Sequence, residues 1–344
     1  MALAVEKSWQ GPLEGIAVTR YKHGLPTKQI RVVEAGHPVP DEAGERAAAE
    51  ILAKARELGP DDLLLALISG GGSSLLSLPA PGVTMAELKS LTGRLLKSGA
   101  DIQEINTVRK HLSAIAGGRL AAASRAPVVA LIISDVTGDD PTHIASGPCA
   151  PDPTTVQDAK AVLAKYGIEF QGPFSESPKT GKAKNQVIAT AYRSLEAAAQ
   201  VFQRQGFRPE ILGDTITGEA REVGRDMARL AKRTPGPAAL ISGGECTVTI
   251  GSEGGRGGRC TEFLLSLGIE LGGGWAIAAD TDGIDGTEDN AGAILTPQSL
   301  RKGHDAKAFL AGHDSYGFFS ALGDLVITGP TRTNVNDYRA ILIP

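Results

Sequence analysis

The chain has 344 residues and a formal net charge of −4, with 42% hydrophobic and 22% charged residues. This composition is typical of a globular protein, and no apolar run approaches the ~20 residues of a membrane span, which excludes membrane insertion. Lys and Arg are not clustered, which argues against a nucleic-acid partner, whereas small anionic ligands are compatible with the sequence. A chain of this length is expected to form two domains with a cleft between them.

The first half of the sequence alternates short apolar runs with longer amphipathic stretches. Predicted strands lie at 15–20, 30–35, 62–72 and 127–136, and predicted helices at 41–59 and 84–100. Thr84 and Glu87 form a capping box at the start of the second of these helices. The alternation predicts an α/β fold whose first domain is a Rossmann-like, largely parallel sheet with helices on both faces.

A stretch rich in Gly, Pro, Ser and Lys at 171–184 predicts a flexible connection between domains. A boundary there gives a first domain of about 1–180 and a second of about 181–344. The second is also predicted to be α/β. Its predicted strands are 185–190, 208–214, 237–244, 246–250 and 274–280, and its predicted helices are 192–205 and 217–232.

The three cysteines, Cys149, Cys246 and Cys260, are odd in number and widely spaced, so they predict neither a disulfide framework nor a zinc site. The first nine residues, interrupted by charges, do not match a secretory signal and are typical of the end of an amphipathic helix. Both observations predict a cytoplasmic protein.

Two apolar runs, at 65–76 and 239–248, lead into Ser-Gly-Gly. Such turns either simply end a strand or expose backbone N–H groups where ligands bind at the edge of an α/β sheet. The first turn is a candidate phosphate or carboxylate cradle, because its glycines allow close approach and its serines offer hydroxyls. Its residues are Ser69, Gly70, Gly71, Gly72 and Ser73. The Walker and dinucleotide-binding glycine patterns are absent from the sequence.

Charged residues follow in two further segments of the first half. Arg109 lies in a basic helical stretch, 106–124, which is either a solvated face or part of a binding site; the pair Gly117-Gly118 favours a bend or close packing. The loop 133–148 contains three aspartates, which either cap turns or bind a cation.

The segment 250–260, IGSEGGRGGRC, combines five glycines with Arg256 and Arg259 and is either a solvated turn or an anion-binding loop. An aspartate-rich segment at 278–292 follows the next predicted strand and does not fit the calcium-loop spacing. Arginines beside aspartates and glycines favour a phosphoryl-transfer site, because Arg neutralises phosphate charge while Asp accepts a proton or binds Mg²⁺. Near the C-terminal end, Asn334 lies in a polar turn.

Taken in order, these motifs resemble the class II glycerate 2-kinase family, whose C-terminal part, here about 238–344, is called the MOFRL domain. The resemblance covers nearly the whole chain. The matching segments are EAGHPVPD (34–41), ISGGGSSLL (68–76), EINTVRKHLSAIAGGRLA (104–121), ISDVTGDDPTHIASGP (133–148), DPTTVQDA (152–159), ISGGECTVTI (241–250), GRGGRCTEF (255–263), DTDGIDGTEDNAGAI (280–294) and ITGPTRTNVNDYRAILI (327–343).

This resemblance implies ATP- and Mg²⁺-dependent phosphorylation of D-glycerate at its 2-hydroxyl, in a cleft between two α/β domains. Arg259, Asp282 and Asn334 correspond to active-site residues of the family. We expect Arg259 to stabilise charge on the transferred phosphoryl group, Asp282 to act as a base or Mg²⁺ ligand, and Asn334 to orient substrate or phosphate. The Ser69–Ser73 loop and Arg109 are expected to hold an anionic part of a ligand.

The sequence departs from the family pattern at Ala116, where Lys is usual, and at Cys260-Thr261, where Asn-Gln is usual. The family also has a lysine-bearing turn upstream of the helix expected at Met1, which predicts that this chain is impaired as a kinase. Two alternatives are an NAD(P)H-dependent hydroxypyruvate reductase and a non-catalytic ligand-binding relative. Association as a homodimer is compatible with the sequence.

Overall fold

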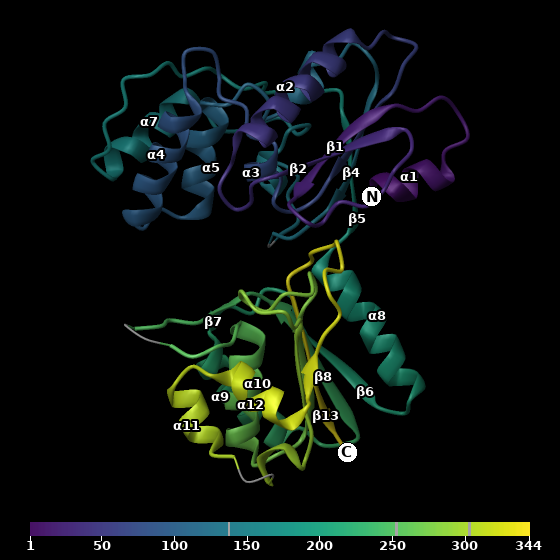
Figure 1. Ribbon diagram of the computed structural model, residues 1–344, viewed down its shortest axis with the longest axis vertical. Coiled ribbons are helices and arrows are strands. Elements are labelled where there is room, and N and C mark those ends of the chain that lie inside the picture. The colour runs from purple at the N-terminus through teal and green to yellow at the C-terminus, as the bar shows by residue number, and fades with distance from the viewer. Residues whose placement is uncertain (137, 252–253, 302–303) are drawn as a thin grey trace. The chain divides into compact units, whose positions relative to one another are not determined.

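The computed structural model of the protein describes residues 1–136, 138–251, 254–301 and 304–344. They divide into two compact units, Met1–Ile188 and Ala189–Pro344 (Figure 1). Three residues of the predicted loops, Thr137, Ser252 and Glu253, lie outside the described residues. The cleft that the sequence predicts between two domains stays a prediction.

The first unit alternates strands and helices, as predicted. Its strands are β1 (Gly15–Arg20), β2 (Ile30–Ala35), β3 (Leu64–Ile68), β4 (Val128–Ile133) and β5 (Lys184–Ala189). Its helices are α1 (Ala2–Ser8), α2 (Glu42–Glu57), α3 (Gly72–Leu75), α4 (Met85–Lys97), α5 (Ile102–His111), α6 (Arg119–Ala123) and α7 (Val156–Lys165), with a 3-10 turn at Ile144–Ser146.

The strands of the first unit pair in parallel, β1 with β2 and β3 with β4. Among the described residues the hydrogen bonds place them in two sheets, β1–β2 and β3–β4–β5. The predicted parallel pairing is therefore confirmed, but the strands do not form the single sheet that the alternation suggests.

Strand β5 belongs to the sheet of the first unit, although the sequence analysis assigns its residues to the second domain. It is next to β4 in the sheet, and Val187 packs against the apolar core that β3 and β4 share. The division between the units falls at Ile188 and Ala189, just beyond the stretch 171–184. Composition alone identifies the irregular stretch, whereas strand pairing decides which unit the next strand joins.

Polar side chains set the helix starts of the first unit. At α4, the Thr84 side chain accepts a hydrogen bond from Glu87 N, and the Glu87 carboxylate accepts one from Thr84 N, so the predicted capping box is confirmed. Asp101 and Glu104 form the same arrangement at α5. Each box satisfies N–H groups that have no partner within the helix, which fixes where α4 and α5 begin.

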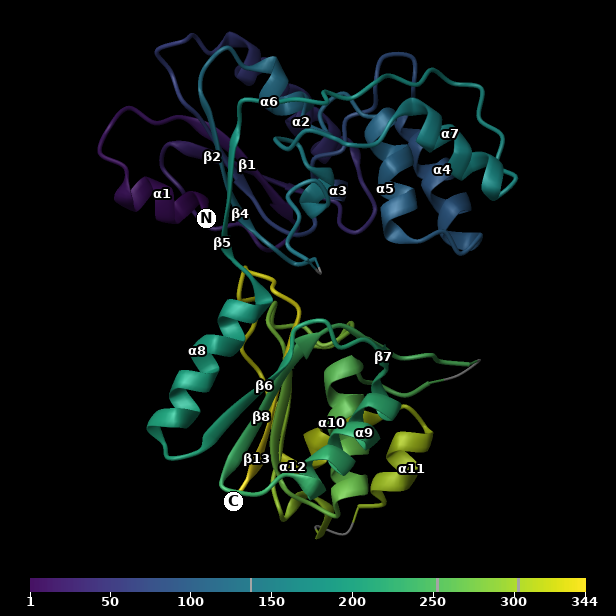
Figure 2. The ribbon, with the colours of Figure 1, turned by 180° about the vertical axis from the view of Figure 1, so that it is seen from behind.

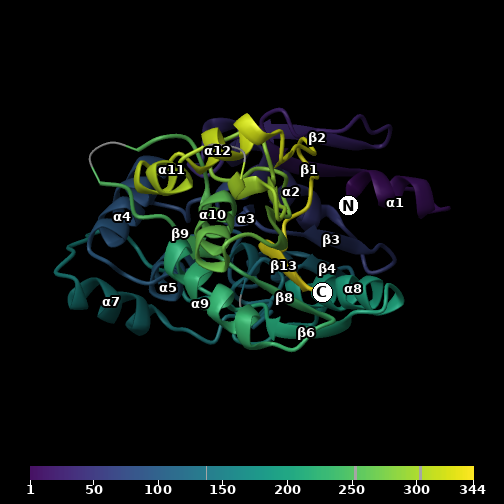
Figure 3. The same ribbon diagram turned by 90° about the horizontal axis from the view of Figure 1, so that it is seen from below.

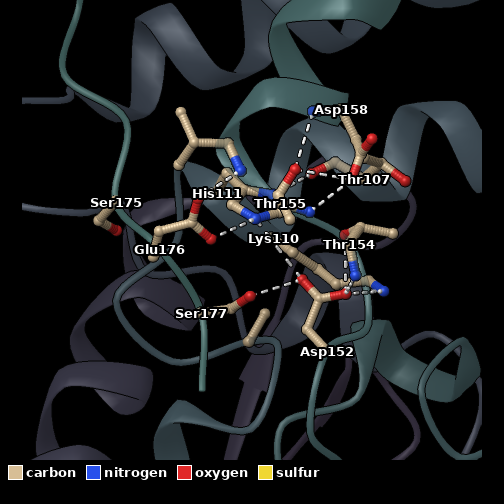
Figure 4. Close-up of polar contacts among 12 residues, drawn as sticks. Thr107, Lys110, His111, Asp152, Thr154, Thr155, Asp158, Ser175, Glu176 and Ser177 are labelled. Atoms are coloured by element: carbon tan, nitrogen blue, oxygen red, sulfur yellow. Dashed lines mark hydrogen bonds and ion pairs between the residues drawn. The ribbon is translucent and has the colours of Figure 1, made fainter. Parts of the chain in front are cut away.

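The stretch 171–183 has no helix or strand, but it is anchored and is not a flexible linker (Figure 4). Lys110, in the last turn of α5, forms an ion pair with Asp152, with 3.1 Å between Nζ and Oδ1 and side chains that are 2% and 0% exposed. The Asp152 carboxylate also accepts hydrogen bonds from Thr154 Oγ1 and Ser177 Oγ, at 2.7 and 2.8 Å. These contacts outweigh burial and lower the pKa of Asp152.

The second unit is also α/β, as predicted. Its strands are β6 (Arg208–Gly213), β7 (Gly218–Glu219), β8 (Ala238–Gly244), β9 (Cys246–Thr247), β10 (Trp275–Asp280), β11 (Gly292–Leu295), β12 (Leu325–Val326) and β13 (Asp337–Ile343). Its helices are α8 (Ala191–Arg204), α9 (Ala220–Arg233), α10 (Arg259–Leu271), α11 (Ala306–Ala311) and α12 (Ser315–Leu322), with a 3-10 turn at Ser299–Arg301.

The main sheet of this unit has the order β12-β11-β10-β13-β8-β6. Strand β6 is parallel to β8, while β13 is antiparallel to both β8 and β10. Strands β6, β8 and β13 are labelled in the view from below (Figure 3). Helix α8 covers β6 and β8 on one face, and α9, α10 and α12 pack on the other (Figure 2). Helix α10 is buried along most of its length, from Cys260 to Gly268, so the larger core surrounds it.

The two Ser-Gly-Gly segments have different structures. Strand β3 ends before Ser69, whereas β8 continues through Gly243 and Gly244, which pair with Tyr338 and Asp337 of β13. The two segments are therefore similar in sequence but do not form the same turn. A neighbouring antiparallel strand decides the difference, because it supplies hydrogen bonds to the glycines of β8.

We expect Lys110→Met to lower the free energy of unfolding by about 3–5 kcal/mol, because it leaves the buried Asp152 carboxylate without its cation. Urea unfolding followed by Trp9 fluorescence in a Trp275→Phe background reports on the first unit. Lys54→Met is the matched control, since the Lys54–Glu14 pair is exposed and pairs of this kind contribute about 0–1 kcal/mol. Equal losses in the two variants would contradict the role given to the buried pair.

Candidate active site

Arg259 begins helix α10, and its guanidinium contacts three carboxylates. Nε donates to Asp337 Oδ1 at 2.8 Å, Nη1 to Glu245 Oε1 at 2.8 Å and Nη2 to Asp280 Oδ2 at 2.6 Å. The Arg259 side chain is 22% exposed. The arginine that the sequence places in a glycine-rich loop is thus fixed within an ion-pair cluster.

Strand order explains why these carboxylates meet. Strand β13 lies between β8 and β10 and is antiparallel to both, so its start is at the same edge as the ends of its neighbours. Asp337 is the first residue of β13, Asp280 is the last of β10, and Glu245 directly follows β8. Residues far apart in the sequence are therefore brought to one end of the sheet.

The pKa values of Arg259 and Asp280 are both raised, but for different physical reasons. Burial lowers the pKa of Arg259, but the carboxylates of Asp337 and Asp280 outweigh it and raise that pKa above its usual value. Burial raises the pKa of Asp280 to about 7, with Asp282 and Asp337 adding to the rise and Arg259 opposing it. Arg259 is thus a permanent cation, while Asp280 is able to exchange a proton near neutral pH.

Asp285 anchors the start of α10. Its carboxylate accepts hydrogen bonds from the backbone N–H groups of Cys260 and Thr261, both at 2.9 Å. A Cβ on Gly258 would lie 2.2 Å from Asp285 Oδ1, so only glycine fits at this position. The first turn of the helix, and with it the Arg259 backbone, is tied to the loop that follows β10.

Asp282 and Asn334, the other two predicted catalytic residues, lie in loops that hold each other. Asp282 O accepts a hydrogen bond from Thr331 N at 3.0 Å, and Asn334 Oδ1 accepts one from Asn336 N at 2.9 Å. Thr281 joins the loops, because its N–H donates to Asn336 O and its Oγ1 accepts from Val335 N. The structure places both loops at the same end of the sheet as Arg259.

Arg256, the other arginine of the glycine loop, is 60% exposed and pairs with Glu288 through Nη2 at 2.5 Å. Its guanidinium carbon lies 3.9 Å from the centroid of the Tyr316 ring. The Arg256 side chain is therefore largely solvated. The contacts add a structural role, since they tie the glycine loop to the acidic loop and to α12.

In the first unit, the predicted Ser69–Ser73 loop lies against three other segments. Cβ atoms on Gly70 and Gly72 would overlap Asp135 and Ala145, at 1.9 and 2.5 Å, and Gly71 has a φ of +77°. These glycines are required by close packing.

The Ser73 hydroxyl contacts the Ser146 hydroxyl at 2.7 Å, and Ser146 donates to Asn106 Oδ1 at 3.3 Å. Arg109 donates from Nη2 to Ser73 O, and burial lowers its pKa. Ser146 has a φ of +59°, an unfavourable conformation of the kind often found at functional sites. The predicted residues Ser73 and Arg109 are thus brought together, and Asn106 and Ser146 join them.

No group of three His, Cys, Asp or Glu side chains able to hold a metal occurs within the described ranges. Mg²⁺, however, often uses one or two protein carboxylates together with substrate phosphates. Asp280 and Asp282 suit that mode, because Asp280 ends β10 and Asp282 follows two residues later in a turn where Asp282 N donates to Asp280 Oδ1 at 3.0 Å. We found no helix in the described chain that is long and apolar enough to span a membrane.

The sequence analysis placed Asp280 within the aspartate-rich segment 278–292 but did not assign Glu245 or Asp337 to the site. Glu245, Asp280 and Asp337 lie in three separate segments, and spacing along the chain does not relate them. One signal was available: Asp337 and Arg339 occupy alternate positions in the otherwise largely apolar segment 337–343. Charges at alternate positions of a buried strand indicate a buried pair.

Comparison with known proteins agrees with this geometry. Residues 1–175 match a domain of unknown function, DUF4147, and residues 238–337 match the MOFRL family. A Pyrococcus horikoshii protein named glycerate 2-kinase is 43% identical over 355 residues, which cover 94% of this chain and 80% of that protein. The chain belongs to the glycerate kinase family. It is therefore a kinase.

Two further similarities support membership of the glycerate kinase family. The crystal structure of a Thermotoga maritima glycerate kinase matches with a TM-score of 0.89 and 41% identity, over 96% of this chain and 85% of that one. An Agrobacterium vitis protein that carries the provisional name hydroxypyruvate reductase is 53% identical over 371 residues, covering all of this chain and 84% of that protein. Both names thus occur among its relatives.

The contact between the loops that carry Asp282 and Asn334 predicts the effect of a small substitution. Gly283 has a φ of +92°, and a Cβ there would lie 2.3 Å from Gly329 O. Gly283→Ala should lower the melting temperature more than Gly323→Ala, whose φ is +74° and which has open space around it. Both variants lose about 1 kcal/mol from the left-handed backbone, and only the first has a clash. Equal shifts in melting temperature would argue against tight loop packing.

The raised pKa of Asp280 predicts a pH dependence of stability. In the folded protein this group keeps its proton up to a pH of about 7, so its contribution is complete below the unfolded pKa of about 4 and is lost as pH rises through 7. We expect wild type to lose up to about 4 kcal/mol of unfolding free energy over this range relative to Asp280→Asn. Urea unfolding followed by Trp275 fluorescence in a Trp9→Phe background measures it; parallel pH profiles would refute the raised pKa.

Proposed function

We propose that this chain is a glycerate 2-kinase that transfers the γ-phosphoryl group of ATP to the 2-hydroxyl of D-glycerate, giving 2-phosphoglycerate and ADP. The observation that carries the proposal is the cluster of Arg259 with Glu245, Asp280 and Asp337 at one end of the sheet, in a chain 43% identical to a protein named glycerate 2-kinase. A fixed cation beside carboxylates supplies what phosphoryl transfer needs from a protein, which is positioning and charge stabilisation.

The reaction requires one proton acceptor. A bond forms between the 2-oxygen of glycerate and the γ-phosphorus, the bond from that phosphorus to the bridging oxygen of ADP breaks, and the hydroxyl proton leaves. Asp280 and Asp282 are the candidate acceptors. The pKa of Asp280, about 7, suits a base working near neutral pH, because a group is most effective when its pKa is close to the pH of reaction.

Arg259 is proposed to stabilise the transferred phosphoryl group. Of its three carboxylate partners, Glu245 is the most exposed, at 55%. A phosphate oxygen is best able to replace Glu245, since breaking an exposed ion pair costs little. Asn334 is proposed to orient substrate or phosphate with its amide nitrogen.

The three carboxylates outnumber the two guanidinium groups that they pair with, Arg259 and Arg339, so the excess negative charge disfavours binding of a polyphosphate to the cluster alone. Mg²⁺ bound between the phosphates and Asp280 or Asp282 would offset this charge, which supports a requirement for the ion. The Ser69–Ser73 loop with Arg109 is proposed to bind an anionic part of a ligand, because it combines hydroxyls with a partly desolvated guanidinium.

Reduction of hydroxypyruvate is the second candidate, favoured by the provisional name of the Agrobacterium vitis relative. The sequence has no dinucleotide-binding glycine pattern, which weighs against this activity. Cytoplasmic location and homodimer formation stay predictions.

One set of assays separates the candidate functions. The protein is incubated with D-glycerate, ATP and Mg²⁺ while ADP release is followed, and separately with hydroxypyruvate and NADH while NADH absorbance is followed. The kinase proposal requires ADP release that depends on glycerate. In the phosphorus NMR spectrum of the product, coupling to protons gives a doublet for the 2-phosphate ester and a triplet for the 3-phosphate ester. A triplet would refute transfer to the 2-hydroxyl, and NADH consumption without ADP release would favour the reductase.

Arg259→Ala should lower kcat for ADP release by about 10²–10³-fold, because it removes a fixed cation from the developing phosphoryl charge. Arg256→Ala is the control, since that exposed side chain pairs with Glu288 and lies outside the Arg259 cluster. We expect its kcat to stay within about threefold of wild type, the usual scale for a surface change. A larger fall for Arg256→Ala than for Arg259→Ala would reverse the assignment.

A further inference from the structure

We infer that Asp337 and Arg339, two charged residues buried in β13, are positioning residues that orient the Arg259 guanidinium. This inference rests on the proposed function, in which Arg259 acts on the phosphoryl group. It adds a chain of contacts that runs from the main core of the second unit to the site. Neither residue is required to touch the substrate.

Asp337 joins two guanidinium groups through its two oxygens. Oδ1 accepts a hydrogen bond from Arg259 Nε at 2.8 Å, and Oδ2 accepts one from Arg339 Nη2 at 2.6 Å. The carboxylate therefore cannot rotate without losing one of two charge-assisted hydrogen bonds. Its orientation is fixed from the core side by Arg339.

Arg339 is itself fixed by three segments of the second unit. Its Nη1 donates to Gly243 O of β8 at 3.2 Å, and its guanidinium carbon lies 5.1 Å from the centroid of the Phe263 ring on α10. Phe263 lies one helical turn after Arg259. A single side chain thus relates β8, β13 and α10, the elements that carry or adjoin the cluster.

Stability alone does not explain this pair. Arg339 and Asp337 are each 1% exposed, and removing two charges from water costs several kcal/mol that their attraction does not always recover. Apolar residues alternate with them along β13 and pack without that cost. The presence of Asp337 and Arg339 in the core is explained by their control of the neighbouring Arg259 guanidinium.

Fixing Nε sets the plane of the Arg259 guanidinium, because Nε is the nitrogen nearest the aliphatic chain. The remaining nitrogens, Nη1 and Nη2, then point to Glu245 and Asp280. Errors of about 1 Å in the position of a catalytic group can cost about 100-fold in rate. We therefore assign to Asp337 and Arg339 an effect on the transition state and not on ground-state binding.

The test is a double-mutant cycle on kcat. Arg339→Met should lower kcat by about 10- to 100-fold and leave the KM values for ATP and D-glycerate within about threefold. In an Arg259→Lys background the same change should have little further effect, since residues that act through one group are not additive. An equal fall of kcat in both backgrounds, or wild-type kcat in Arg339→Met, would overturn the inference.

A matched control separates positioning from general destabilisation. Arg221→Met also removes a cation from a buried carboxylate on α10, because Arg221 pairs with Glu262, whose side chain is 2% exposed. It should lower the melting temperature as Arg339→Met does, but leave kcat near that of wild type. Similar losses of kcat in both variants would reduce Arg339 to a structural role.

Two further measurements test the inference if Arg339→Met fails to fold or the protein shows no kinase activity. Where Arg339→Met does not fold, Asp337→Asn replaces it and should lower kcat by the same factor. Wild-type kcat in Asp337→Asn, or an equal fall in the Arg259→Lys background, would again overturn the inference. The NMR signal of Arg259 Nε–Hε needs no activity: it should be slowly exchanging in wild type and fast exchanging in the variant. If the wild-type protein has no kinase activity but the Nε–Hε proton exchanges faster in the variant, the proposed function fails and the positioning role stands. If the protein is an active kinase but the exchange rate does not change in the variant, the positioning role fails.

Discussion

Arg259 is held by three carboxylates that come from three separate segments, and the second unit is arranged around this contact. The end of β8, the end of β10 and the start of β13 meet at one edge because β13 runs antiparallel between the other two strands. Helix α10 supplies the arginine from its first position, and Asp285 caps that helix from the loop after β10. An apolar core keeps these elements in register, so the charged cluster depends on packing as well as on charge.

Such a cluster has more carboxylates than cations, and this excess shapes its chemistry. A permanent guanidinium beside a carboxyl group that titrates near neutral pH combines charge stabilisation with proton transfer in one place. The proposed binding of ATP at this cluster would therefore be aided by an added cation such as Mg²⁺. The buried Asp337–Arg339 pair extends this arrangement into the core, where a rigid scaffold is able to hold a long flexible side chain such as Arg259.

The first unit uses buried charge for a different purpose. Lys110 and Asp152 attach an irregular stretch to helix α5, and Arg109 precedes Lys110 on that helix. The last turn of α5 therefore has two tasks, since Arg109 reaches the Ser69–Ser73 loop while Lys110 fixes the connection that leads to β5. The composition of 171–184 is that of a flexible linker, but hydrogen bonds to distant residues order it. Local sequence reports how a segment would behave alone and not which groups lie beside it in the fold.

The sequence by itself determined the α/β class, the positions of most strands and helices, the capping box at Thr84 and the family, because periodicity, caps and ordered motifs are local properties. It also led to the prediction that Arg259, Asp282 and Asn334 are catalytic, and the fold places all three at one end of a sheet. Only the tertiary structure decided that β5 joins the first unit, that β8 continues through Gly244, and that Arg259 contacts Glu245, Asp280 and Asp337. These outcomes depend on pairing between strands distant in the chain, and spacing along a sequence carries no information on which distant strand becomes a neighbour.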